Sequence, residues 1–487
     1  MINTEIKQLR PNILWKHFSE ICNIPHPSKH EQQIIEYIKQ FAIAQKLEYK
    51  IDNVGNIVVL KPATFGFEHR KKLVLQSHVD MVPQKNETTV HDFEKDPIQT
   101  FIEGEWVKAK GTTLGADNGI GAAAALATLE DATLEHGPIE ALFTIDEETG
   151  MTGAFELKPD FLNGEILLNL DTEDEGELCI GCAGGVNTTA NFTISYEKTP
   201  SDFGSFKISL TGLNGGHSGI DINMGRGNAN KLMARLLWNA TKDFNIRIIT
   251  IDGGTLRNAI PREAFACIAI AKGEEAYFRT FIEEFKQTVS KELAFTEPNL
   301  NIIVENTCKS EYSFSSDFQN RALSAIYGVI NGSVRMSDGL KDVVETSTNL
   351  AIVKTFSGML EVKFLVRSSI ESAKDDLCKT IESTMQLAGA EVKHSGSYPG
   401  WKPNIDSDIL RIMKETHIKL YNKEAHVVVV HAGLECGIIG SVYPDMEMVS
   451  FGPTIKYPHS PDEKVHIGSV ARFWDYLTEV LKNIPVK

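Results

Sequence analysis

The sequence predicts an α/β protein in which a mixed sheet carries helices on both faces and an α+β domain interrupts the chain. At 487 residues the chain is too long for one ordinary hydrophobic core, so two or three domains are expected. Strand-like apolar runs alternate with helical segments up to about residue 186, and the same alternation returns after about residue 392. We therefore expect one discontinuous domain, residues 1–186 and 393–487, interrupted by a second domain, residues 187–392.

Apolar spacing predicts the elements of the first segment. Apolar residues three and four positions apart indicate helices, and short apolar runs bounded by turn residues indicate strands. We expect helices at residues 31–46 and 119–129, and strands at residues 49–51, 57–60, 72–76, 139–145 and 166–170. Asp117 and Asn118 lie where the N-cap of the second helix is expected.

The interrupting domain shows a different order of elements. Strands with alternating apolar residues are expected at residues 188–196, 205–211, 246–251, 264–271, 301–306, 348–355 and 360–366. Helices are expected at residues 228–239, 276–291, 315–329 and 369–387. Because a similar order recurs, we interpret this domain as a doubled strand–helix–strand unit with antiparallel strands. The closing segment predicts helices at residues 407–421 and 465–484 and buried strands at residues 426–430 and 448–451.

Charge and hydropathy exclude two classes of partner. The chain carries a net charge of −16, and no Lys/Arg cluster resembles a nucleic-acid-binding surface. The first twenty residues lack the apolar core of a signal peptide, and no uncharged apolar run of about 18 residues occurs. Seven cysteines, an odd number, fit reduced thiols better than a disulfide framework. We therefore expect a cytoplasmic protein that binds neither nucleic acid nor a membrane.

Acidic and histidine residues follow the predicted strands of the α/β layer at the points where those strands end. The ends of buried strands are where α/β proteins build their sites, and imidazoles with several carboxylates suit a pair of zinc-like ions. For each residue taken alone, a buried core histidine, a solvated acidic loop or a helix cap is the ordinary alternative. The residues concerned are His78, Asp80, Asp117, Glu147, Glu148 and Asp171, with His459 far later in the chain.

The spacing of these residues indicates a division of labour. His78 and Asp80 are two positions apart, so in an extended segment they point the same way, and Asp80 can hold the second nitrogen of His78. Glu147 and Glu148 are adjacent, so their side chains diverge. One of the two glutamates can therefore bind metal while the other faces substrate as a base.

Several motifs resemble those of the M20 metallopeptidases. The metal-site motifs of that family are matched by residues 78–83, 115–119, 146–150 and 459–461. Longer phrases resemble one branch, the aminoacyl-histidine dipeptidases (PepD-type or Xaa-His dipeptidases), at residues 169–175, 212–219 and 431–437. The resemblance spans nearly the whole chain and implies a zinc-peptidase-like catalytic domain interrupted by a lid or dimerisation domain.

The resemblance also implies roles for the site residues. One zinc ion would be held by His78 and Asp171 and the other by Glu148 and His459, with Asp117 bridging both ions. Asp80 would support His78, Glu147 would be the general base, and the Asp117–Asn118 peptide bond would be cis. In the interrupting domain His217 would donate a hydrogen bond to the reacting carbonyl, and Asn258 and Arg367 would hold the terminal carboxylate of the peptide. The cofactors implied are two Zn²⁺ ions, with Mn²⁺ or Co²⁺ as alternatives.

The activity implied is hydrolysis of unblocked dipeptides, including Xaa-His peptides such as β-Ala-His, by a metal-bridging hydroxide. A sibling activity, that of a tripeptidase or an aminoacylase, is the nearest alternative, because the metal motifs do not separate the two. A catalytically inactive metal-binding scaffold is a remote alternative, because Glu147 and all the candidate ligands are kept. Relatives commonly form homodimers, so a homodimer is expected, although a doubled lid could also close the site within one chain. The sequence leaves open the side-chain preference and the roles of His431 and Glu435.

Overall fold

The computed structural model describes residues 3–307 and 309–487 and divides into two compact units. Unit 1 contains the chain up to Gly181 together with Trp401–Val429 and Leu434–Lys487, and unit 2 contains Cys182–Gly400 and Val430–Gly433. The limits expected from the sequence fall inside two strands of unit 2, β9 (Gly184–Thr193) and β21 (Glu391–Tyr398). The division of the chain into a catalytic and a lid domain stays a prediction.

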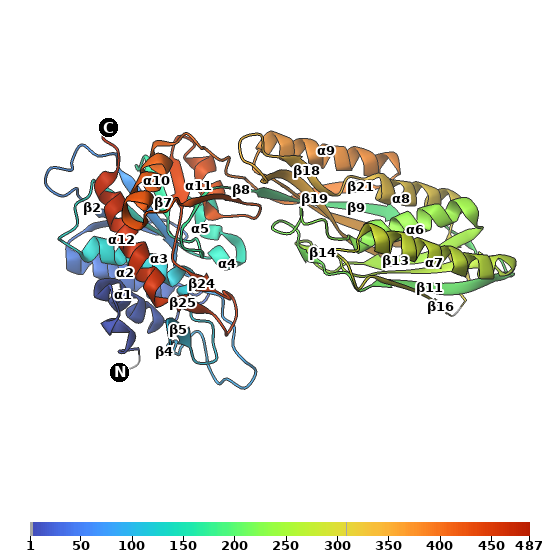
Figure 1. The fold of residues 1–487 in the computed structure, drawn as a ribbon, viewed down its shortest axis with the longest axis horizontal. Helices are drawn as coiled ribbons and strands as arrows, with labels where there is room; N and C mark the ends of the chain where they lie inside the picture. The colour runs from blue at the N-terminus through green and yellow to red at the C-terminus, as the bar shows by residue number, and fades with distance from the viewer. Residues whose placement is uncertain (1–2, 308) are drawn as a thin grey trace. The chain divides into compact units, whose positions relative to one another are not determined.

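Unit 1 contains an eight-stranded mixed sheet (Figure 1). Its four central strands run parallel to one another, and antiparallel strands flank them. Every residue of β3 and of β6 is buried, so both faces of the sheet are covered at its centre. The strand order is β1 (Glu48–Ile51), β2 (Ile57–Lys61), β6 (Ile139–Thr144), β3 (Leu73–His78), β7 (Ile166–Asn169), β23 (Glu447–Ser450), β8 (Glu177–Cys182) and β22 (His426–Val430). The predicted α/β class is confirmed.

Helices of unit 1 flank this sheet. The Ala-rich helix α3 packs on β3 and β6, and α1 packs on α3. The helices are α1 (Asn12–Cys22), α2 (Gln32–Gln45), α3 (Ala116–Glu130), α4 (Glu147–Gly150), α5 (Thr152–Glu156), α10 (Asp408–Tyr421), α11 (Glu435–Val442) and α12 (Ile467–Asn483).

The parallel centre brings the predicted site residues to one edge of the sheet. His78 is the last residue of β3 and lies beside Thr144, the last residue of β6. Gln76 of β3 lies beside Asn169, the last residue of β7. The segments that follow β6 and β7 therefore emerge next to His78, and they carry the acidic residues of the motifs.

The start of α3 differs from the predicted N-cap. Asp117 and Asn118 have non-helical backbone angles, and the peptide bond between them is cis, as the family resemblance implied. The Asn118 amide donates to the carbonyl of Leu170, at 2.7 Å. A Cβ atom on Gly121 would lie 2.4 Å from Asn118 Oδ1 and 2.5 Å from the Leu170 carbonyl oxygen, so only glycine fits there. Asp117 is thus held at a bend before the regular helix.

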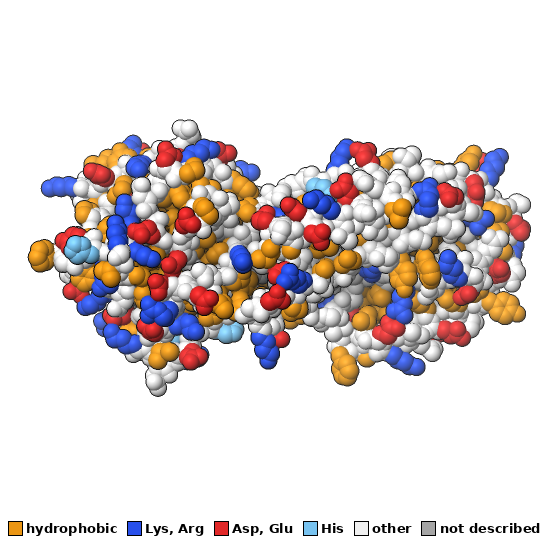
Figure 2. Space-filling model, turned by 90° about the horizontal axis from the view of Figure 1, so that it is seen from above, with side chains coloured by type: hydrophobic (Ala, Val, Ile, Leu, Met, Phe, Trp, Pro, Cys, Tyr) orange, Lys and Arg blue, Asp and Glu red, His pale blue; other side chains and the backbone are white. Residues whose placement is uncertain are grey.

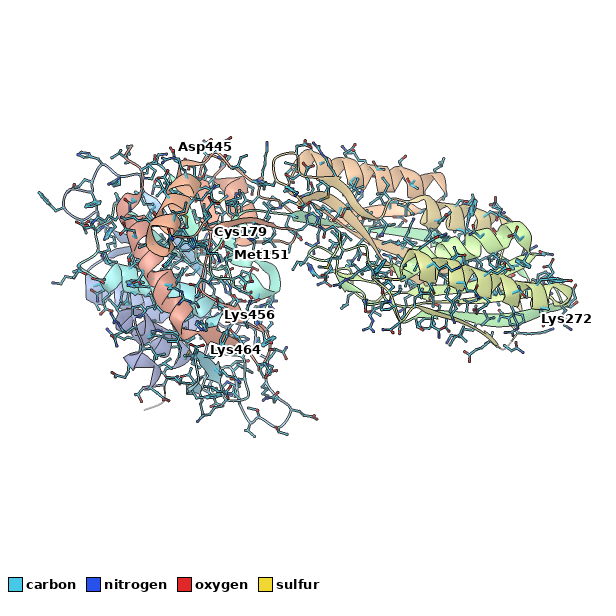
Figure 3. The ribbon with its side chains drawn as sticks, viewed as in Figure 1. Met151, Cys179, Lys272, Asp445, Lys456 and Lys464 are labelled. Atoms are coloured by element: carbon cyan, nitrogen blue, oxygen red, sulfur yellow. The ribbon has the colours of Figure 1, made fainter. Side chains whose placement is uncertain are left out.

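A small four-stranded sheet in unit 1 presents His459. Its order is β24 (Ile455–Lys456), β25 (Lys464–His466), β5 (Trp106–Ala109) and β4 (Thr100–Glu103). Lys456 and Lys464, labelled in Figure 3, pair across the β24–β25 hairpin, and His459 lies in the turn between them. The sequence predicts helix from residue 465, whereas the structure forms β25 first and begins α12 at Ile467.

Unit 2 is built from two copies of one topology, strand–helix–strand–strand–helix–strand. One copy contains β11 (Phe203–Thr211), α6 (Ala229–Asp243), β13 (Ile246–Gly253), β15 (Ala264–Ala271), α7 (Glu275–Glu292) and β16 (Asn301–Asn306). The other contains β9, α8 (Ser316–Gly328), β19 (Val344–Phe356), β20 (Met359–Ser368), α9 (Glu371–Leu387) and β21. In each copy the spatial order of the strands is fourth, first, third, second. The recurrence expected from the sequence is present, but its bounds differ. Residues 301–306, expected to open the second unit, form the last strand of the first copy, and the second copy begins at β9, which precedes the first copy in the chain.

The two copies in unit 2 share one sheet. Their second strands, β13 and β19, pair through Asp252 with Lys354 and Gly253 with Val353, and β18 (Gly332–Met336) pairs with β19. Burial alternates along most of β9, β11 and β15, which is typical of a sheet with one face covered. In Figure 1 helices α6, α7, α8 and α9 lie over the sheet.

The surface is mixed in charge. On the face drawn in Figure 2, Lys and Arg side chains are interspersed with Asp and Glu side chains. Among residues 3–307 and 309–487, no helix combines the length and apolar character that a membrane span requires.

Candidate metal and catalytic site

Two groups of metal-ligand type meet at Asp117 in unit 1. His78, Asp117 and Asp171 form one group, and Asp117, Glu148 and His459 form the other. Within each group, one ligand atom from each residue lies within 4.8 Å of the others. The structure thus gathers the five residues that the sequence singled out as ligands, and their assignment as ligands stays a prediction.

Asp117 offers one carboxylate oxygen to each group. Its Oδ1 lies 3.2 Å from Nε2 of His78, and its Oδ2 lies 3.2 Å from Nε2 of His459. His78 Nε2 also lies 3.4 Å from Oδ1 of Asp171, and His459 Nε2 lies 3.0 Å from Oε2 of Glu148. This arrangement is suited to a carboxylate that bridges two cations.

The donor set fits metal ions better than it fits hydrogen bonding alone. Oε1 of Glu148 is buried and accepts no hydrogen bond from any described residue, and the buried Oδ1 of Asp171 has only the long contact with Nε2 of His78, at 3.4 Å. Buried carboxylate oxygens without donors are rare in folded proteins and call for a partner of opposite charge. Three carboxylates and two imidazoles are the ligand types that zinc takes in catalytic sites.

The crowded charges shift the pKa values of the two histidines. Burial disfavours a charged His78, but Asp171, Asp117 and Asp80 outweigh burial and raise its pKa well above the usual value. Hydrogen bonds with Asp117 and Glu148 raise the pKa of His459 to about 11. In the metal-free protein both imidazoles therefore hold a proton where a cation would bind.

Glu147 lies at the edge of this cluster. It forms a third group of ligand-type atoms with His78 and Glu148, within the same 4.8 Å limit. Burial raises the pKa of Glu147 well above its usual value, and the charge of His78 opposes that shift. A carboxyl group so placed is suited to accept a proton and return it.

Asp80 supports the cluster in two ways. Its Oδ1 lies 3.3 Å from Nδ1 of His78, on the ring side opposite Asp117. Its carboxylate also accepts the backbone N–H groups of Glu147, at 3.0 Å, and Glu148, at 3.2 Å, and the hydroxyl of Ser28, at 2.8 Å. The spacing of His78 and Asp80 in the sequence predicted the contact between their side chains. No local sequence pattern predicted the contacts of Asp80 with backbone N–H groups.

A buried polar network lies beside the ligands on the central strands. Gln76 donates to Oε2 of Glu435, at 2.6 Å, and the Thr144 hydroxyl donates to the same oxygen, at 2.8 Å. Asn169 donates to Oε1 of Gln76, at 2.5 Å, and accepts from the hydroxyl of Ser450. Burial raises the pKa of Glu435 to about 7. The sequence signal for this network is a polar residue two positions before a candidate ligand in an apolar strand, as Gln76 is before His78.

In unit 2, His217 ends one short strand, and Asn258 directly precedes the short strand that pairs with it. β12 (Gly216–His217) pairs with β14 (Ala259–Ile260), and the N–H of Ser218 donates to the carbonyl of Asn258. Nδ1 of His217 accepts the N–H groups of Gly219, at 3.2 Å, and Ile220, at 3.1 Å. Since burial and the nearby Arg367 lower the pKa of His217, the ring is neutral and its Nε2 carries the proton.

Arg367 of unit 2 is a buried cation with spare hydrogen-bonding capacity. Its side chain is 4% exposed, its Nη1 donates to the Tyr398 hydroxyl at 3.0 Å, and its Nε has no partner among the described residues. Arg257, by contrast, is committed to the carbonyls of Thr188 and Phe364 and to the hydroxyl of Thr189. Arg367 is therefore the better candidate for binding an anionic group.

His431 belongs to the same region of unit 2 as Arg367. Its Nε2 lies 2.7 Å from the Ser347 hydroxyl, and its buried Nδ1 has no described partner. Burial, Arg367 and His217 lower the pKa of His431 to about 3. The imidazole is therefore a neutral group placed among the candidate substrate-binding residues.

Comparisons with known proteins agree on one family. The model of "Peptidase family M20/M25/M40" matches residues 74–483. The chain is 48% identical over 484 residues to the cytosol non-specific dipeptidase of Escherichia coli (strain K12), with 99% of this chain and 100% of that protein covered. Its structure superposes on aminoacylhistidine dipeptidase from Vibrio alginolyticus with a TM-score of 0.96 and 47% identity, over 99% of both chains. A tripeptidase from Staphylococcus aureus shares the fold, with a TM-score of 0.55 and 16% identity over 98% of this chain and 99% of that chain.

Zinc binding to the metal-free protein is expected to release protons. A pKa raised to about 11 keeps His459 protonated at neutral pH, and a ligating imidazole must lose that proton. The apparent zinc affinity should therefore rise with pH across the neutral range, with about one proton released per ligating imidazole. Isothermal titration calorimetry in buffers of different ionisation enthalpy measures this release. The variant His459→Ala should bind one zinc ion fewer and release fewer protons, and zinc uptake without proton release would contradict the expectation.

Proposed function

We propose that this chain, which belongs to peptidase family M20/M25/M40, is a cytosolic metallodipeptidase that hydrolyses unblocked dipeptides, including Xaa-His peptides such as β-Ala-His. The observation that carries the proposal is Asp117, with one oxygen toward each of two histidine-containing ligand groups and Glu147 alongside. Full-length similarity to two proteins that are named as dipeptidases supports the choice of substrate class.

The ligands divide into two sets that share one residue. His78 and Asp171 would hold one zinc ion, Glu148 and His459 the other, and Asp117 both. Mn²⁺ or Co²⁺ could take the same positions, since these ions accept the same ligand types. Zinc ions bound there would acidify a water molecule and polarise the carbonyl of the peptide bond.

Glu147 is assigned the proton transfers. Its carboxylate takes the proton of the attacking water and gives it to the leaving amine when the peptide bond breaks. Asp80 holds the backbone N–H of Glu147, at 3.0 Å, and one nitrogen of His78, so it positions the base and a ligand together. Removing Asp80 would disturb both the base and that ligand.

We assign to unit 2 the residues that bind the carbonyl oxygen and the terminal carboxylate of the peptide. The Nε2–H of His217 is free to donate to the carbonyl oxygen as negative charge develops on it. Asn258 and Arg367 are assigned to the terminal carboxylate, because the buried guanidinium of Arg367 has no acidic partner in its hydrogen bonds. We also propose that unit 2 is the lid and dimerisation domain and that the enzyme is a homodimer.

A substrate panel tests the proposed function. The purified enzyme loaded with zinc should hydrolyse Gly-His, β-Ala-His and other free dipeptides, and it should leave acetyl-amino acids and tripeptides largely uncut. Amino-acid release measured by chromatography provides the readout. Cleavage of acetyl-amino acids or tripeptides in preference to dipeptides would assign the chain to a sibling amidohydrolase activity instead.

Replacing Glu147 tests the base. Glu147→Gln should lower kcat by about 10³-fold, because the amide cannot carry the proton, while zinc content is unchanged. Glu148→Gln is the matched control: the adjacent carboxylate is a ligand, so this variant should lose zinc as well as activity. Steady-state kinetics combined with metal analysis separates the two effects. Wild-type turnover by the Glu147→Gln enzyme would remove Glu147 from the mechanism.

Replacing Arg367 tests recognition of the carboxylate. Arg367→Met should lower kcat/KM for free dipeptides by roughly 10- to 100-fold, the value of a lost charge-assisted hydrogen bond. Dipeptide amides, which lack the carboxylate, should be affected far less by the same substitution. Arg257→Met is the control, because Arg257 serves the backbone of unit 2 and should not change the preference for dipeptides over their amides. Equal losses on both substrates in Arg367→Met would rule out a carboxylate contact.

A further inference from the structure

Glu463 binds the loop that precedes Asp117 through four consecutive backbone N–H groups. The side chain is 2% exposed. Its Oε2 accepts the N–H groups of Leu114, at 2.7 Å, and Gly115, at 2.9 Å. Its Oε1 accepts the N–H groups of Ala116, at 2.8 Å, and Asp117, at 3.2 Å. Every bond is made to main chain, so the carboxylate fixes the path of the loop.

The loop is shaped to receive a carboxylate. Gly115 has a φ of 70°, and the turn it allows lets successive N–H groups converge on one side. A Cβ atom on Gly115 would lie 3.0 Å from the sulfur of Met81, so a side chain there would displace the end of Met81.

The other end of Glu463 leads to His459. Glu463 closes the turn of the β24–β25 hairpin, and its own N–H donates to the carbonyl of Ser460, at 3.0 Å. The Ser460 hydroxyl in turn donates to the carbonyl of Tyr457, at 2.8 Å. The His459 side chain is 52% exposed, so packing does not fix it, and its position depends on how the turn is anchored.

We infer that Glu463 is a positioning residue that fixes Asp117 and His459 relative to each other. The carboxylate of Asp117 can then bind both metal ions. Two of the proposed ligands, 342 residues apart in the chain, are connected through this single side chain. Asp117 belongs to both ligand groups. Loosening the backbone of Asp117 should therefore lower the affinity of the protein for both metal ions. This inference rests on the proposed metal centre and does not depend on which peptide is cleaved.

Glu140 provides a matched comparison within unit 1. Its side chain is 1% exposed and accepts the backbone N–H groups of Asn163, at 2.8 Å, and Gly164, at 3.0 Å. Glu140 is the second residue of β6, whereas the site lies beyond Thr144, the last residue of that strand. Both glutamates therefore anchor main chain, but only Glu463 anchors main chain that carries ligands.

The experiment compares zinc affinity in Glu463→Gln and Glu140→Gln. Glutamine replaces one carboxylate oxygen with an NH₂ group, which donates and does not accept. Two of the four backbone N–H groups that Glu463 binds would therefore lose their acceptor. Chelator competition on the purified proteins, with unfolding of the metal-free forms monitored by circular dichroism, gives affinity and stability separately. We expect Glu463→Gln to weaken both zinc ions by about 10- to 100-fold, the usual effect of losing a group that orients a ligand. Glu140→Gln should unfold at a lower temperature and keep the wild-type zinc affinity.

Either of two results with the glutamine variants would overturn the inference. One is wild-type affinity for both ions in Glu463→Gln, and the other is an equal loss of affinity in Glu140→Gln. If Glu463→Gln does not fold, Glu463→Asp replaces it, because the charge is kept and only the reach is shortened. Glu463→Asp should fold and bind zinc more weakly than wild type, and wild-type affinity there would also overturn the inference. The experiment measures metal affinity and not hydrolysis. If the wild-type protein failed to cleave dipeptides, the proposed function would be wrong, but the inference about Glu463 would not be affected.

Discussion

The carboxylate of Asp117, placed between two imidazoles, is the contact on which the rest of the site depends. Its two oxygens face His78 and His459 at 3.2 Å each, and Asp171 and Glu148 complete the two groups. Negative charge this concentrated needs compensation, and in the metal-free chain protons on the two histidines supply it. Cations can replace those protons, because a buried oxygen of Glu148 has no donor among the described residues and a buried oxygen of Asp171 has only Nε2 of His78, at 3.4 Å.

Carboxylates that are not themselves proposed ligands hold this arrangement through the main chain. Asp80 accepts the N–H groups of Glu147 and Glu148, and Glu463 accepts those of the loop before Asp117. Glu435 acts instead through side chains, since it accepts from the amide of Gln76 and the hydroxyl of Thr144 on the neighbouring strands. The geometry of the candidate site is therefore set by backbone that buried acids fix in place, which suits a site whose ligand distances must be narrow.

The larger elements and the candidate ligands were predictable from the sequence, because both leave local signals. Long amphipathic helices such as α7 and apolar strands such as β3 show their period directly. Glu147, Glu148 and Asp171 follow apolar strands. Short elements such as β25, with three residues, carry too little pattern to be recognised. β22 was expected to be buried from its apolar run, but it is the edge strand of its sheet and is only half-buried.

Contacts between residues that are far apart in the chain could not be predicted from local sequence patterns. Asp117 resembles a helix cap locally, and its outward turn toward the histidines depends on the bend at Asn118. Glu463 resembles a solvated acid after a Pro-Asp pair, and its burial depends on a loop nearly 350 positions earlier. Pairs so distant leave no periodic signal, and a resemblance to a family supplies only those residues that the family motifs contain.

Diffraction from crystals grown with zinc, recorded on both sides of the zinc absorption edge, tests the central claim most directly. We expect two anomalous peaks, about 3.5–4 Å apart, with one oxygen of Asp117 on each. His78 and Asp171 should contact one peak, and Glu148 and His459 the other. A single zinc ion, or two ions of which one does not touch Asp117, would contradict a centre built on a shared carboxylate.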